Sequence, residues 1–232
     1  MLSLLRTILF PRSCVWCGMS WHYLCGSCKK LLHPHPELCP LTHQASEWYA
    51  TRQDLLLTPS ALDGCIVLFR FDKMIRKLIR NLKYYHRHDI ADFLSERMIF
   101  AFQSHPVLSS HSASILITWV PSHRWRRYMV KWYNQSFLLA RTMAHLLWDT
   151  IHYHQLIRKT RHTSSQVGLN REARKKNLSG AFECIATPPP WSIVVIVDDV
   201  LTTGSTLVEI AHTIKQSQPD CQVRWCCIAR NG

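Results

Sequence analysis

Apolar positions along the chain repeat with two different periods, and their alternation predicts strands followed by helices. Short runs of aliphatic residues are typical of strands buried on both faces, whereas Met74, Leu78 and Leu82 recur at helical spacing. The predicted strands are 65–69, 114–120, 152–157, 194–199 and 223–228. The predicted helices are 73–83, roughly 90–103, 134–148 and about 204–217. This order predicts an α/β domain with a mostly parallel sheet.

The N-terminal part of the chain shows little of this periodicity. Residues 1–45 are rich in Cys, Trp, His and Pro and predict a small separate unit. Residues 46–64 contain few core positions and are interpreted as a connection, so that the α/β domain spans 65–232. Apolar residues within 4–9 predict a helical stripe that docks on the body, because Arg6 and the missing cleavage site argue against a signal peptide.

Four cysteines in the N-terminal unit predict a metal site. Cys14 and Cys17 form one Cys-x-x-Cys pair, and Cys25 and Cys28 form a second. Four thiolates complete a closed tetrahedral zinc site with no open position, so its role should be structural or partner-binding. The alternatives are a disulfide pairing or the remnant of a lost site, and both are less favoured without a secretion signal.

The remaining cysteines and the hydropathy indicate a cellular compartment. Several of them lie in apolar, strand-like runs, which suits buried reduced thiols. No run of 18 apolar residues is present, so we expect no membrane span and a place in the cytoplasm, either free or held by partners at the inner face of the membrane. Cys39 and His43 are candidates for a second metal, although a lone Cys and His are more often ordinary loop residues.

The charge of the chain favours polyanionic partners. With 28 Lys and Arg against 15 Asp and Glu, the formal net charge is +13. Such an excess favours nucleic acid or phosphate-rich small molecules, and the alternative is a solvated basic surface. The predicted loop 122–131 interleaves Arg124, Arg126 and Arg127 with Trp and Tyr. Proteins grip single-stranded DNA with this combination, through phosphate contacts and base stacking.

The segment 194–206 carries the strongest chemical signal. An aliphatic run, two adjacent carboxylates, a loop of small residues and a helix start follow one another, which is how an open α/β sheet binds a phosphorylated ligand. Asp198 and Asp199 are predicted to accept hydrogen bonds from ribose hydroxyls. The predicted 5′-phosphate loop is Thr202, Thr203, Gly204, Ser205 and Thr206. An ordinary strand-to-helix turn with a Thr cap would need neither the carboxylates nor so many small residues.

This segment resembles the signature of the type I phosphoribosyltransferases, which bind phosphoribosyl pyrophosphate (PRPP). Nearly the whole chain resembles the ComF family, the competence-protein branch of that superfamily, to which the GntX proteins of enteric bacteria also belong. The resemblance rests, in chain order, on the four cysteines, 78–84, Val120-Pro121 with the arginine loop and Asn134-Gln135, 166–182, and Asp198-Asp199.

The resemblance implies a ligand and its binding groups. PRPP or a related ribose phosphate is expected to bind with Mg²⁺, which Asp198 and Asp199 would anchor through water besides acting as the catalytic carboxylates. Pyrophosphate needs cations from other segments. The candidates are Lys83, Arg124, Arg126, Arg127, Arg171 and Arg174.

Two functions are compatible with these features. The ComF resemblance implies a role in DNA uptake during natural transformation, with single-stranded DNA and with a competence helicase or other DNA-uptake proteins as partners. The alternative is an active phosphoribosyltransferase in nucleotide salvage. The zinc unit, the basic excess and the lack of a recognisable nucleobase pocket favour the first function.

Overall fold

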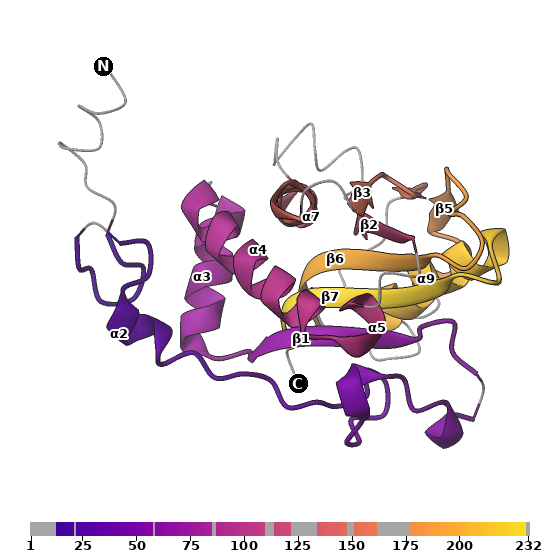
Figure 1. The fold of residues 1–232 in the computed structure, drawn as a ribbon, viewed down its shortest axis with the longest axis horizontal. Helices are drawn as coiled ribbons and strands as arrows, with labels where there is room; N and C mark the ends of the chain where they lie inside the picture. The colour runs from indigo at the N-terminus through magenta and orange to yellow at the C-terminus, as the bar shows by residue number, and fades with distance from the viewer. Residues whose placement is uncertain are drawn as a thin grey trace, which may run out of the picture.

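The structure is a computed structural model, and it describes residues 13–20, 22–57, 59–84, 87–109, 114–121, 134–147, 151–161 and 177–230. Within these residues, five strands form one parallel sheet in the order β1-β7-β6-β2-β3 (Figure 1). The strands are β1 (Gly64–Arg70), β2 (Ile115–Trp119), β3 (Ile151–Tyr153), β6 (Ile193–Leu201) and β7 (Gln222–Arg230). The parallel α/β sheet expected from the apolar pattern is confirmed.

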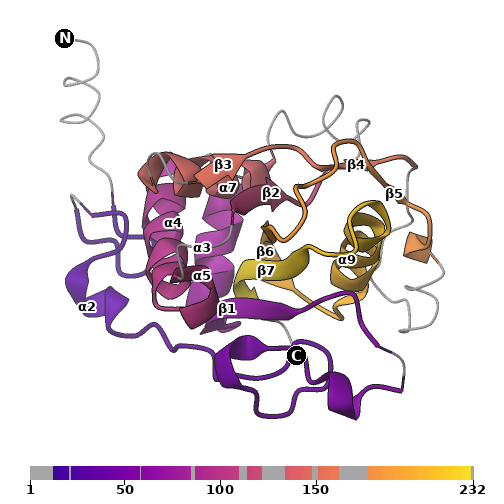
Figure 2. The same ribbon diagram turned by 45° about the vertical axis from the view of Figure 1, so that its right-hand side comes forward.

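Helices cover both faces of the sheet. These helices are α3 (Lys73–Tyr84), α4 (His88–Gln103), α7 (Gln135–Leu146) and α9 (Ser205–Ser217). Helices α3, α4 and α7 lie on one face and α9 on the other (Figure 2). Helix α3 follows the expected spacing most closely, since it buries Met74, Leu78 and Leu82 and exposes Arg76 and Arg80.

Strand β6 lies in the middle of the sheet and is buried on both faces. Val195 and Val197 belong to the core under α3, α4 and α7, and Val194 and Ile196 belong to the core under α9. Because successive side chains of a strand point to opposite faces, a strand in this position needs an unbroken aliphatic run. The strand continues to Leu201, so the two carboxylates lie inside it. The prediction that they end the strand is therefore wrong.

The predicted strand 152–157 is divided into two elements. Its first part is β3, and its last residue begins β4 (Ile157–Lys159), which pairs antiparallel with β5 (Phe182–Cys184) in a separate two-stranded sheet. The residues between β3 and β4 include exposed polar side chains. The N–H of Leu156 donates at 3.2 Å to a side-chain hydroxyl of β2, that of a threonine, and not to a backbone carbonyl of that strand. The chain therefore leaves the main sheet before β4 starts.

The N-terminal part of the chain packs against the body and along the edge of β1. Its short elements, with one from the middle of the chain, are α2 (Gly26–Lys29), η1 (Glu47–Tyr49), η2 (Gln53–Leu55) and α5 (Pro106–Ser109). His35 donates its backbone N–H to the carbonyl of Leu68, and Arg70 donates to the carbonyl of His33, each at 3.0 Å. A segment outside the main sheet therefore pairs with the outer edge of β1, as Figure 1 shows below the sheet.

Some expectations fall on segments that are not described. The apolar stripe at 4–9, the arginine loop 122–131 and most of the basic segment 158–178 lie outside the described residues. No helix in the described part of the chain combines the length and the apolar character that a membrane span requires.

Candidate functional site

The four N-terminal cysteines come together as the sequence predicts. The Sγ atoms of Cys14, Cys17, Cys25 and Cys28 all lie within 4.8 Å of one another, and Cys17 and Cys25 are 3.6 Å apart. Gly18 adopts a φ of 80°, which closes the first knuckle so that its N–H donates to the carbonyl of Cys14 at 3.0 Å. Four thiols at this spacing are consistent with a structural zinc.

The electrostatics of the cluster fit a bound cation. Burial raises the pKa of Cys28 to about 12, and the neighbouring cysteines add to this effect. Burial also acts against the Cys14 thiolate, but hydrogen bonds from the backbone at Cys17, Cys25 and Trp16 outweigh it and lower its pKa to about 6. Thiolates so close together repel one another, and a divalent metal relieves that repulsion.

The cysteine cluster is attached to the helices of the body. Tyr23 packs on Phe93 of α4 with ring centroids 5.5 Å apart, and Lys77 of α3 lies over the ring of Trp16 at 5.6 Å. Buried Cys25 and Leu24 belong to the same hydrophobic core as α3 and α4. The cluster therefore completes this side of the core.

The possible second metal site at Cys39 and His43 has no further ligand among the described residues. Cys39 is fully buried, and its Sγ accepts the N–H groups of Thr42 at 3.4 Å and Arg52 at 3.3 Å. The guanidinium of Arg230 lies against the side chain of His43 and so places a positive charge beside it. Among the described residues, the only group with metal-ligand geometry is the four-cysteine cluster.

The predicted phosphate loop connects β6 to α9. Thr202 and Thr203 are exposed, and Gly204 caps the helix with a φ of 76°. A Cβ at this position would lie 3.4 Å from Leu41, so the positive φ is the stronger reason for glycine. The Thr203 and Ser205 hydroxyls are 3.2 Å apart. The arrangement presents the N-terminus of a helix and small polar side chains to one side, which suits a phosphate group.

Asp198 is held by the first turn of α7. The Ser136 hydroxyl donates to Asp198 Oδ1 at 2.9 Å, and the same oxygen accepts the N–H of Asp199 at 2.9 Å. Asn134 caps α7 by accepting the N–H of Ser136 at 3.0 Å and donates to the carbonyl of Val120 at 3.0 Å. The end of β2, the start of α7 and the end of β6 are thereby joined. Burial, followed by the charge of Asp199, raises the pKa of Asp198 to about 7.

Asp199 is paired inside the protein. Its Oδ2 forms an ion pair with the ammonium of Lys83, in the last turn of α3, and its Oδ1 accepts the N–H of Val200 at 2.9 Å. Burial acts to lower the pKa of Lys83, but the charges of Asp199 and Asp198 outweigh it and raise the pKa above its usual value.

The other predicted basic groups lie on segments that are not described. Arg124, Arg126 and Arg127 fall within 122–133, and Arg171 and Arg174 fall within 162–176, so all five lie outside the described residues. Two residues that the sequence reasoning had not assigned to the site are Ser136 and Asn134. The signal that could have found them is the Asn at the first position of the predicted helix 134–148, because Asn is a typical cap.

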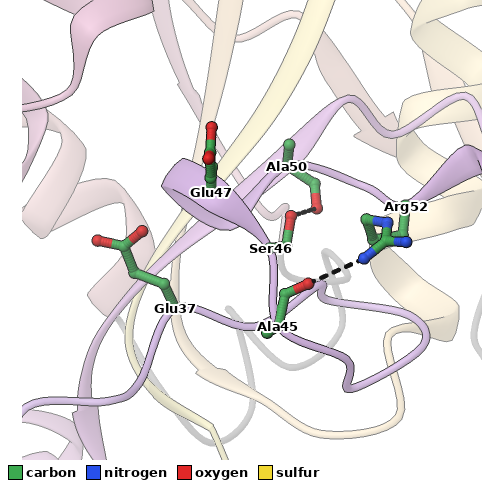
Figure 3. A pocket seen from close by; sticks show the side chains of 6 residues that line it. All are labelled: Glu37, Ala45, Ser46, Glu47, Ala50 and Arg52. Carbon is green, nitrogen blue, oxygen red and sulfur yellow. Dashed lines mark hydrogen bonds between the residues drawn. The ribbon is translucent and has the colours of Figure 1, made fainter.

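A pocket of about 590 Å³ lies elsewhere, in the N-terminal part of the chain (Figure 3). It is lined by Glu37, Ala45, Ser46, Glu47, Ala50 and Arg52. Ser46 donates to the carbonyl of Ala50 at 2.7 Å, and Arg52 donates to the carbonyl of Ala45 at 3.2 Å. Arg52 also forms an ion pair with an aspartate. Two carboxylates and a neutralised arginine do not suit a phosphorylated ligand, so we do not place the site here.

Strand β6 and the loop that follows it lie within a segment that matches a known protein family. Residues 137–232 match the family described as "Phosphoribosyl transferase domain". The chain is 26% identical over 214 residues to "Competence protein F" of Haemophilus influenzae, which covers 89% of this chain and 92% of that protein. It is 28% identical over 207 residues to "DNA utilization protein YhgH" of Escherichia coli K12, covering 88% of each chain.

A solved structure gives a weaker match. The purine phosphoribosyltransferase from Pyrococcus horikoshii is 15% identical and superposes with a TM-score of 0.33, covering 60% of this chain and 83% of that chain. A similarity of this size does not bear on the fold or the function.

Proposed function

We propose that the chain is a ComF/YhgH-like protein with a phosphoribosyltransferase domain, and that it acts in DNA uptake during natural transformation. In this proposal it binds single-stranded DNA, works with a competence helicase or other DNA-uptake proteins, and holds PRPP or a related ribose phosphate. The names of its relatives, which refer to competence and to DNA utilization, support the first part.

The observation that carries the ligand proposal is the geometry at the end of β6. Two carboxylates precede the loop that leads to the N-terminus of α9. In this loop Thr202 and Thr203 are exposed, and the glycine that follows them has a positive φ. A phosphate dianion fits the N–H groups of the loop, and a ribose diol fits carboxylate acceptors. In the proposal, Asp198 and Asp199 also orient water molecules of a bound Mg²⁺, which would neutralise the pyrophosphate group.

Calorimetric titration of PRPP with Mg²⁺ tests this site. Changing Asp198 and Asp199 together to Asn keeps the shape of both side chains but removes charge-assisted acceptors, each worth roughly 1.5–3 kcal/mol. We expect the double variant to bind PRPP at least tenfold more weakly than the parent. Asp92→Asn, on the exposed face of α4, is the matched control and should bind like the parent. Equal affinity of the double variant and the parent would mean that the carboxylates are not ribose ligands.

The DNA-binding part of the proposal rests on charge. The net charge is +13, and Arg124, Arg126 and Arg127 alternate with aromatic residues in the sequence. Fluorescence anisotropy should show binding of single-stranded DNA that weakens steeply with salt, because phosphate counterions are released. Changing the three arginines to Ala should weaken binding for all sequences alike, whereas Arg52→Ala should not, since Asp54 already neutralises that side chain. Binding that does not depend on salt would contradict this part.

The alternative function is an active phosphoribosyltransferase in nucleotide salvage, which the match of residues 137–232 to the phosphoribosyl transferase domain supports. The two candidates differ in one measurable reaction. A screen for pyrophosphate release from PRPP in the presence of each nucleobase identifies the enzyme. Tight PRPP binding without release for any base would leave a ligand-binding module and exclude the salvage enzyme.

A further inference from the structure

The ion pair between Lys83 and Asp199 occupies one of the two carboxylates expected to bind ribose. Lys83 comes from the last turn of α3, whereas Asp199 lies near the end of β6. The side chain of Asp199 is only 7% exposed, and that of Lys83 is 26% exposed. The carboxylate is thus largely buried, while the lysine paired with it is partly open to solvent.

Both oxygens of Asp199 already have a partner, and Oδ2 is buried. One oxygen accepts the N–H of Val200 at 2.9 Å, and the other contacts the ammonium of Lys83. Ser136 holds the adjacent Asp198 in the same way from the other side. Because Oδ2 is buried beside the ammonium, a ribose diol can reach this oxygen only if Lys83 moves away from the carboxylate.

We propose that Lys83 acts as an exchangeable counter-ion. It leaves Asp199 for the anionic group at C1 when a ribose with anionic groups at both C1 and C5 binds. This inference rests on the proposed ribose-phosphate site. It makes Lys83 a specificity-determining residue that selects PRPP over a ribose carrying a 5′-phosphate alone.

The physical reason is the cost of leaving a lysine ammonium without a partner. Ribose hydroxyl groups can replace the ammonium at Asp199, but they are neutral and supply no negative charge to pair with Lys83. A pyrophosphate at C1 supplies that partner, and the four-carbon stem of lysine, partly exposed here, permits the movement. A ligand with only a 5′-phosphate meets the Gly204 loop but offers Lys83 no anion, so it must compete with the ion pair.

The test compares two ligands in calorimetric titrations with Mg²⁺ on the full chain. The parent should bind PRPP at least tenfold more tightly than ribose 5-phosphate. In Lys83→Met the ratio of the two affinities should fall at least tenfold, because PRPP loses its cation while ribose 5-phosphate no longer competes with an ion pair. Lys73→Met removes a charge from the exposed first turn of the same helix and should leave the ratio unchanged.

A purely structural ion pair gives a different result. If Lys83 only fixes α3 to β6, Lys83→Met weakens both ligands equally, and an unchanged ratio overturns the proposal while the site stands. Lys83→Gln, which keeps length and polarity without charge, serves if the Met variant fails to fold, and the same change of ratio is expected. A parent that binds neither ligand overturns the ribose-phosphate site and the exchange together.

Discussion

Replacing Asp198 with Asn should make the protein more stable, and the gain should grow with pH. The pKa of Asp198 is about 7 in the folded chain against an ordinary 3.8, because the carboxyl is buried and lies beside Asp199. Below pH 4 the group is protonated in both folded and unfolded chains and contributes nothing. Between pH 4 and 7 only the unfolded chain ionises, so stability falls as the pH rises, and above pH 7 the loss is constant.

The magnitude follows from this difference in pKa. At 1.36 kcal/mol for each pKa unit, a shift of about three units corresponds to at most about 4 kcal/mol. Part of this loss is already present at pH 5.5, so a comparison of pH 5.5 with pH 8 measures only the remainder. We expect Asp198→Asn to be about 1–2 kcal/mol more stable relative to the parent at pH 8 than at pH 5.5.

Urea unfolding at several pH values between 5.5 and 8 measures this difference. Both proteins carry the same cysteine cluster, so the effect of pH on the thiolates cancels in the comparison. Asp92→Asn, a change on the exposed face of α4, should show a difference from the parent that does not vary with pH. If the advantage of Asp198→Asn is the same at pH 5.5 and pH 8, the carboxyl is not ionised at a cost in the folded protein and the reasoning is wrong.

Two further changes test other parts of the structure. Cys25→Ser should lower the zinc content from about one per chain. It should also reduce thermal stability, because the cluster is part of the core under α3 and α4. Metal analysis that finds no zinc in the parent protein, purified without chelator, would contradict this. Gly204→Val should weaken PRPP binding more than the double Asn variant does, since a β-branched residue cannot readily adopt a φ of 76°; unchanged affinity in titration would show that the loop does not approach the phosphate.

The main sheet could be predicted because its strands carry local signals. The unbroken aliphatic run at 194–197 identifies a central strand without any knowledge of its neighbours, and the spacing of Met74, Leu78 and Leu82 identifies α3. The division of 152–157 could not be predicted in the same way. It depends on pairing with Phe182–Cys184, which lies far away in the sequence and has no pattern of its own.

Part of the candidate site has a local signal for the same reason. Asp198, Asp199 and the Thr-Thr-Gly loop are contiguous, so their order alone indicates the chemistry. The partners of the carboxylates are not contiguous. The ion pair of Lys83, a predicted pyrophosphate ligand, with Asp199 joins α3 to β6, and Ser136 reaches Asp198 only because the chain turns back after β2. Contacts of this kind arise from the topology of the sheet and leave no local pattern.

The chain that pairs with the outer edge of β1 also limits how copies of this protein can associate. An open sheet edge is a template for strands of other molecules, which leads to aggregation. Here the edge is covered by the sequence His33-Pro34-His35-Pro36, in which His35 turns its N–H inward to Leu68. Proline has no N–H, so alternate positions of the covering segment offer no donor to a further strand. Because this segment leads directly out of the cysteine cluster, disrupting the cluster is expected to expose the edge of β1 to strands of other copies of the chain.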